Sequence, residues 1–76
     1  MIFDFIEWDD ANLDHATRRL SAQQIEQAIW NATVMRRHRR HADRALIVST
    51  TDGGMHVTVV VQIVGGGVRP IAAWEV

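Results

Sequence analysis

The 76-residue sequence contains no cysteine, no lysine and no tyrosine, and its one proline is Pro70. Because cysteine is absent, neither disulfide bonds nor a zinc–thiolate site can stabilise the core. This absence of cysteine is consistent with a reducing compartment. No apolar run approaches the roughly 20 residues that cross a bilayer, and the first ten residues lack the basic region of a secretory signal. We therefore expect a cytoplasmic protein with no contact to a membrane.

A chain of this length is expected to form one domain, residues 1–76, with a thin core. Folding at this size buries only about 60% of the surface of the unfolded chain. The 47% hydrophobic and 22% charged residues are ordinary for a globular domain and exclude a disordered one. A partner protein or a homodimer could supply the burial that a single chain lacks.

The net charge of -1 conceals a strong separation of charge along the chain. Residues 1–14 hold five acidic residues and no base, whereas residues 18–44 hold seven arginines against two acidic residues. All eight basic residues are arginine, whose planar guanidinium binds phosphate or carboxylate through two parallel hydrogen bonds. A GC-rich genome would produce the same bias toward arginine, so composition leaves both explanations open.

The N-terminal half of the chain predicts one strand followed by two helices. Residues 2–8 combine aromatic and β-branched side chains with interspersed acids, which is typical of a half-buried strand. Asp9 or Asp10 then caps a helix that runs to about Leu20. The side chains expected to face inward on this helix are Leu13, Ala16, Thr17 and Leu20, and those on its polar face are Asn12, His15 and Arg19.

Ser21 and Gln24 have the spacing of a capping box, so the second helix is predicted from about Ala22 to Trp30 or Asn31. Trp30 either covers a neighbouring element or offers an apolar contact to a partner. The side chains on the apolar side of this helix are Ile25, Ala28, Ile29 and Ala32.

The C-terminal half predicts a meander of three antiparallel strands, preceded by residues 36–44 as an arm or the end of an edge strand. Pro70 cannot donate a ladder hydrogen bond, which places the last strand at an edge. The expected fold belongs to the α+β class. Its elements follow the order β-α-α and then a three-stranded antiparallel meander, with the helices packed on one face of the sheet. The strands are expected at residues 45–51, 55–64 and 68–76, and glycine-rich turns at residues 52–54 and 65–67.

Four short motifs follow one another along the chain. The first two are W-D-x-x-N-x-x-H at residues 8–15 and L-S-x-x-x-I-E-x-A-I at residues 20–29. The third, T-D-G-G at residues 51–54, precedes a valine-rich strand, and the fourth, V-R-P-I at residues 68–71, opens the last strand. In this order the motifs resemble BrnT-type toxins, and the resemblance covers nearly the whole chain.

The resemblance implies a RelE-like fold and the toxin of a bacterial toxin–antitoxin pair, which cleaves RNA, free or on the ribosome, and so inhibits translation. It also implies a cognate antitoxin protein. The chain departs from the family pattern at Ser49-Thr50, where a Gly-Arg pair is usual, at Trp74, where an arginine is usual, and after Val76, where a helix usually follows. The alternative is therefore a catalytically inactive BrnT-like module that binds an antitoxin or another partner protein.

Cleaving RNA without a metal needs a base for the 2′-OH, a cation for the phosphate charge and an acid for the leaving oxygen. His15 and Arg19, one turn apart on the first predicted helix, could form such a pair, and His56 on the central strand is a second candidate. The alternative for each histidine is a structural hydrogen bond. Arg69 is the one arginine of the meander, and the resemblance makes it a candidate for phosphate contact. This chemistry requires no cofactor.

Residues 36–44, R-R-H-R-R-H-A-D-R, hold five cations in nine residues, which repel one another unless an anion lies nearby. That anion could be RNA, the acidic N-terminal segment of the same chain or an acidic partner, and the remaining alternative is a solvated loop. His38 and His41 are spaced H-x-x-H, but too few further ligands are near in sequence for us to expect a metal site. The candidate RNA-binding residues are Arg36, Arg37, Arg39, Arg40 and Arg44.

Overall fold

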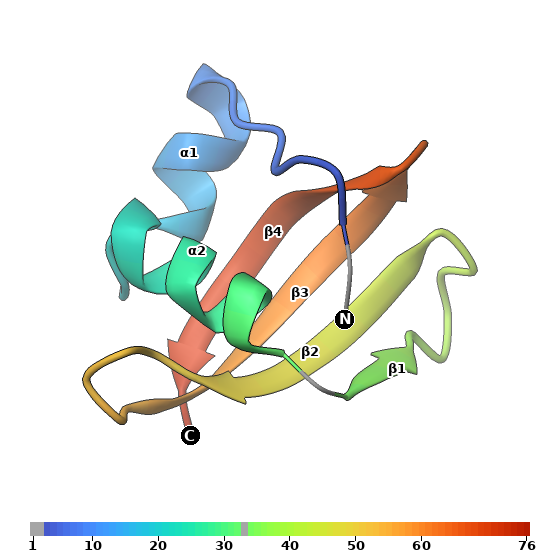
Figure 1. Cartoon of the computed structure of the whole chain (residues 1–76). Coiled ribbons are helices and arrows are strands. Elements are labelled where there is room, and N and C mark those ends of the chain that lie inside the picture. The colour runs from blue at the N-terminus through green and yellow to red at the C-terminus, as the bar shows by residue number, and fades with distance from the viewer. Residues whose placement is uncertain (1–2, 33) are drawn as a thin grey trace.

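The computed structural model describes residues 3–32 and 34–76. They fold into two helices and a four-stranded antiparallel sheet with the strand order β1-β2-β3-β4 (Figure 1). The helices are α1 (Asp10–Ala16) and α2 (Ala22–Asn31), and the strands are β1 (Met35–Arg37), β2 (Arg44–Thr50), β3 (His56–Val64) and β4 (Gly67–Glu75). The α+β class expected from the sequence is confirmed.

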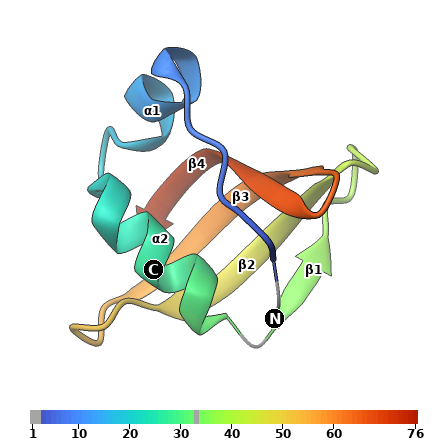
Figure 2. The ribbon, with the colours of Figure 1, turned by 45° about the horizontal axis from the view of Figure 1, so that its top comes forward.

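Both helices lie on the same face of the sheet, as the sequence predicts (Figure 1 and Figure 2). Helix α1 packs on β4, and α2 packs on β2 and β3. Among the described residues, no helix covers the opposite face of the sheet. The fully buried side chains between the two layers are Ile25, Ala28, Ile29, Ile47, Val57, Val59, Val61 and Val68.

Helix α1 ends at Ala16, about one turn earlier than predicted. It begins as expected, because the Asp9 carboxylate accepts the N–H of Asn12 and the Asn12 side chain accepts the N–H of Asp9. It ends because Thr17 bonds the Leu13 carbonyl through both its N–H and its hydroxyl, a local bond that competes with further helix.

The inward side of α1 also differs from the prediction. Ala16 and Leu20 are buried, but Leu13 is 39% exposed, whereas Asn12, expected on the polar face, is only 5% exposed. Asn12 lies inside because its amide group donates to two backbone carbonyls, that of Pro70 in a buried hydrogen bond and that of Glu7 in a partly buried one. A hydrophobic pattern cannot anticipate such a residue, since its burial depends on carbonyls supplied by the rest of the fold.

Helix α2 confirms the prediction at both ends. The Ser21 hydroxyl accepts the N–H of Gln24, and the Gln24 side chain accepts the N–H of Ser21, which completes the capping box. Trp30 lies off the buried side and is 51% exposed. The buried residues on its apolar side are Ile25, Ala28, Ile29 and, at the C-cap, Ala32.

The strand predicted at residues 2–8 is wrong for residues 3–8, and residue 2 lies outside the described residues. This segment is extended but makes only one parallel bridge, from Ile6 to Val68 of β4. Phe3, Ile6 and Trp8 pack against the core, and their unequal spacing does not match the alternation of a strand. The sheet takes its fourth strand from β1 instead.

The predicted meander is confirmed, and each strand boundary agrees within one residue. Val59 at the centre of β3 lies opposite Ile47 of β2 and Ala73 of β4. Pro70 lies on β4, which is an edge strand as predicted. An irregularity in the register between Val60 and Val61 shifts β4 by one residue, so Ala72 lies opposite Val60 and Trp74 lies opposite Thr58. In the described part of the chain, no helix is long and apolar enough to cross a membrane.

Candidate nucleic-acid interface

The arginines of residues 36–44 gather at the β1 edge of the sheet. Strand β1 pairs with β2 so that Arg36 lies opposite Leu46 and Arg37 lies opposite the buried Ala45. Because neighbouring residues of a strand point to opposite faces, Arg37 projects to the helix side and Arg36 to the uncovered side. We call Arg36, Arg37, Arg39, Arg40 and Arg44 the arginine edge.

The loop between β1 and β2, residues 38–43, is held by its own hydrogen bonds. The N–H of His38 donates to the carbonyl of Arg44, and the N–H of Arg44 donates to the carbonyl of His41. The N–H of Arg40 donates to Nδ1 of His38. Asp43 is tied to β3 by two further hydrogen bonds, one to its carbonyl and one to its carboxylate. The arginine edge therefore stands on a backbone of defined shape.

In the described part of the chain, no carboxylate neutralises the arginine edge. Within residues 3–32 and 34–76, none of its five guanidinium groups forms an ion pair, and the Asp43 carboxylate is bonded to the Gln62 amide instead. Arg36, Arg37, Arg39 and Arg40 are exposed. The acidic helix α1 packs on β4, at the opposite edge of the sheet. Neutralisation by the N-terminal segment of the same chain, one of the alternatives left by the sequence, is therefore contradicted.

Arg44 is the one member of the arginine edge that is partly buried. Its Nε atom is buried without a hydrogen-bond partner in the described part of the chain. Leaving a buried donor of this kind unpaired costs about 1–3 kcal/mol. An anion close to the Arg44 guanidinium would offset part of that cost.

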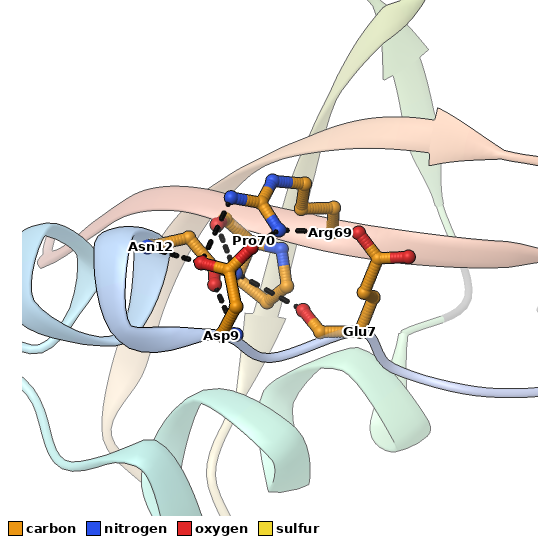
Figure 3. A network of polar contacts seen from close by, with 5 residues as sticks. All are labelled: Glu7, Asp9, Asn12, Arg69 and Pro70. Atoms are coloured by element: carbon orange, nitrogen blue, oxygen red, sulfur yellow. Dashed lines mark hydrogen bonds and ion pairs between the residues drawn. The ribbon is translucent and has the colours of Figure 1, made fainter.

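Arg69, by contrast, is engaged by carboxylates of the protein itself (Figure 3). Its Nη1 atom lies 2.6 Å from Asp9 Oδ2 and 3.1 Å from Glu7 Oε1, and its Nη2 atom lies 3.1 Å from Asp9 Oδ1. A phosphate would have to displace both carboxylates to reach this guanidinium. The geometry supports a structural role for Arg69, holding the segment before α1 against β4.

This ion pair should make stability depend on acid pH. The hydrogen bond from Arg69 lowers the pKa of Asp9 from its usual 3.8 to about 2, and Asp9 in turn raises the pKa of Arg69. A carboxyl group whose pKa is lower in the folded than in the unfolded state contributes its full stabilisation to the fold at pH values above its unfolded-state pKa. This stabilisation is lost as the pH falls through the folded-state pKa.

We therefore expect Arg69→Met to lower the urea concentration at the midpoint of unfolding at neutral pH. The difference in this midpoint between the variant and the unsubstituted protein should become smaller as the pH falls from about 4 to about 2. Tryptophan fluorescence would follow unfolding. A difference that stays constant down to pH 2 would contradict the assigned pair.

His15 and Arg19 remain together although α1 ends before Arg19. Both line a pocket of about 270 Å³ between the α1–α2 connection and β4, and Arg18 and Trp74 line it as well. The pocket joins one imidazole, two guanidinium groups and one indole ring, which are suited to proton transfer, phosphate contact and base stacking. Arg18 and Trp74 were not predicted for the site, because nothing local in the sequence links residues that far apart.

His56 lies apart from this pocket, at the start of β3 and opposite Thr50. Trp74 lies opposite Thr58, so His56 is its diagonal neighbour, about 7–8 Å away by the usual spacing of a sheet. The pocket is at the β4 edge and the arginine edge is at the β1 edge, at opposite sides of the sheet. The predicted catalytic and RNA-binding residues therefore do not form one compact site.

Among the described residues, no group of three or more histidine, aspartate or glutamate side chains could hold a metal ion. The rings of His38 and His41 lie with their centroids 5.1 Å apart, but no third potential ligand from residues 3–32 or 34–76 groups with them. Comparison of the chain with protein-family models, with curated proteins and with solved structures found no match.

Proposed function

We propose that this protein binds RNA through the arginine edge. The observation that carries the proposal is a group of five guanidiniums on a short strand and a hydrogen-bonded loop, with no carboxylate paired to any of them in the described part of the chain. Phosphates would supply the missing negative charge, and each phosphate bound would release condensed counterions. The choice of RNA among phosphate polymers rests on the resemblance to BrnT-type toxins.

The same resemblance supports a toxin of a toxin–antitoxin pair, acting in the cytoplasm on RNA that is free or bound to ribosomes. In this proposal the fold is a reduced RelE-like one, in which residues 3–8 run beside β4 where the sequence predicts a first strand. The pocket at the β4 edge would be the place of cleavage, with His15 transferring a proton and Arg19 contacting the phosphate. His56 is kept as a second candidate for the proton.

Cleavage at this pocket is tested by His15→Gln, which keeps a polar side chain but cannot transfer a proton at neutral pH. We expect at least 100-fold slower cleavage of total RNA, since a positioned acid or base contributes about 10²–10⁴-fold. His41→Gln, in the β1–β2 loop, is the matched control and should cleave at the normal rate. Assays with and without ribosomes would define the substrate.

The outcome also decides between the toxin and the alternative function. If the unsubstituted protein makes no cuts in either assay but still binds a protein partner, the inactive module would be favoured. Equal loss of cleavage in the His15 and His41 variants would contradict the assignment of the pocket.

A further inference from the structure

The face of the sheet turned away from the helices carries a continuous apolar strip. The register places Leu46 and Val48 of β2 beside Val60 and Thr58 of β3, and Ala72 and Trp74 of β4 continue the same rows. Val48 is 53% exposed and Trp74 is 36% exposed. We call this surface the open face, defined by Arg36, Arg44, Leu46, Val48, Thr50, His56, Thr58, Val60, Gln62, Val64, Arg69, Ala72 and Trp74.

A shallow groove of about 500 Å³ runs over the β1 side of the open face. The groove is lined by Leu46 and Val48 of β2, by Thr58 of β3, by Arg36 of β1 and by Val34, which precedes β1. Val34 is 52% exposed. Apolar side chains left accessible together in a groove are typical of an interaction surface.

The open face carries three arginines by register, and the carboxylates that lie against it are already bonded to other groups. The Asp43 carboxylate accepts from the Gln62 amide, and Glu7 and Asp9 pair with Arg69. Arg69 is engaged by Asp9 and Glu7, but Arg36 and Arg44 have no acidic partner in residues 3–32 and 34–76. The groove is therefore lined mainly by apolar side chains and carries the positive charge of Arg36 beside β1.

Two occupants fit this surface poorly. A second copy of the chain would bring the same face, on which the described carboxylates are already bonded to Gln62 or Arg69, and it would add further cations beside Arg36 and Arg44. RNA would find aliphatic side chains in the groove, where base stacking requires aromatic rings, and neither Trp74 nor His56 of the open face lines that groove.

We infer that the open face binds an amphipathic helix of a partner protein whose apolar side carries leucine-like side chains and whose flank carries carboxylates. The apolar side would cover Leu46 and Val48, and the carboxylates would pair with Arg36 and Arg44. The bound helix would form a third layer on a sheet whose two described helices lie on the other side. This surface is separate from the proposed RNA contacts except at Arg36 and Arg44, which lie at the border of both.

The probe is a synthetic 18-residue helical peptide with leucines on one side and glutamates along its flank, and a second peptide with lysines in place of the glutamates. Titration into ¹⁵N-labelled protein is expected to shift the amide signals of Leu46, Val48 and Thr58 with the glutamate peptide. The lysine peptide should bind at least 10-fold more weakly, because it would place cations beside Arg36 and Arg44.

Val48→Glu should weaken binding of the glutamate peptide at least 10-fold, and Trp30→Glu, at an exposed apolar residue of α2, should leave it unchanged. Val48→Thr keeps the β-branched shape and should weaken binding of the glutamate peptide several-fold. This second variant keeps the inference testable if Val48→Glu does not fold. Circular dichroism would check each variant.

Equal binding of the two peptides, or shifts confined to the helix side, would overturn the inference. A dimer in sedimentation that Val48→Glu dissociates would assign the face to a second copy instead. Shifts of Leu46 and Val48 on adding single-stranded RNA, without peptide binding, would assign it to RNA. Arg39→Ala with Arg40→Ala should weaken RNA binding and spare peptide binding, so failure of one proposal is distinguishable from failure of the other.

Discussion

Replacing Arg36, Arg37, Arg39 and Arg40 by alanine is expected to lower the affinity for single-stranded RNA by roughly 100-fold at about 0.1 M salt. The slope of log K against log salt concentration should fall in magnitude by about 3, since each phosphate contact on a single strand contributes about 0.7. The reason is that these four guanidiniums are exposed and unpaired in the described part of the chain, so binding RNA breaks no internal ion pair. Fluorescence anisotropy of a labelled oligonucleotide at several salt concentrations would measure both quantities.

The matched control replaces the same four residues by lysine. It keeps the charge and removes the planar fork, so the salt slope should be retained while the affinity falls only in part. An alanine variant with an unchanged slope would remove these four residues from the RNA contact surface.

Asn12→Asp is expected to destabilise the fold by at least about 2 kcal/mol, because it removes two buried donors and can place a charge before two carbonyl oxygens. The Asn12 Nδ2 atom lies 3.0 Å from the carbonyl oxygens of both Glu7 and Pro70 (Figure 3). The substituted carboxylate would keep the shape of the side chain and the oxygen that accepts the Asp9 N–H, but it donates nothing when ionised. A chain of this size has a total stability of about 4–11 kcal/mol, so the loss would be a large fraction of it.

Urea denaturation followed by tryptophan fluorescence would measure the change in the free energy of unfolding. Asn31→Asp is the control, because the Asn31 amide donates to Thr50 and Asp52 at an exposed position. Losing the hydrogen bonds that the Asn31 amide donates should lower the free energy of unfolding by less than about 1 kcal/mol, because the groups left without a partner can bond to water. Equal destabilisation by the two substitutions would mean that Asn12 does not hold the N-terminal segment to β4 as described.

The parts of the fold that sequence predicts correctly are those encoded by neighbouring residues. Helix α2 has its capping box and its apolar spacing within ten residues. Strands β2 to β4 are bounded by glycine turns, and Gly54 and Gly65 adopt positive φ values there, 89° and 60°, which favour glycine. These elements can be predicted from neighbouring residues alone, without information on how the rest of the chain packs.

The parts that were wrong depend on contacts distant in sequence. Residues 3–8 have the composition of a strand, but they are anchored to Gly66 and Val68 and pack Phe3 and Ile6 into the core. The alternative that residues 36–44 include the end of an edge strand is confirmed for Arg36 and Arg37, which end the edge strand β1. The register of β1 with β2 could not be predicted, because this charged run has no apolar alternation.

The candidate site divides in the same way. The clustering of the five residues of the arginine edge could be predicted, because they lie within nine consecutive residues, and their contact with RNA stays a prediction. The pairing of Arg69 with Asp9 joins residues 60 positions apart, and spacing alone could not indicate it. The same is true of the pocket that brings Trp74 to His15, since only the packing of α1 on β4 creates it.

The most direct test of the central claim is to observe the arginine side chains while RNA is added. In a spectrum that resolves the Nε–H groups of arginine, titration with a single-stranded oligonucleotide should shift the signals of Arg36, Arg37, Arg39 and Arg40, while that of Arg69 stays in place. Binding that leaves the arginine edge unshifted, or that shifts Arg69 and the pocket residues Arg18 and Arg19 alone, would contradict the account.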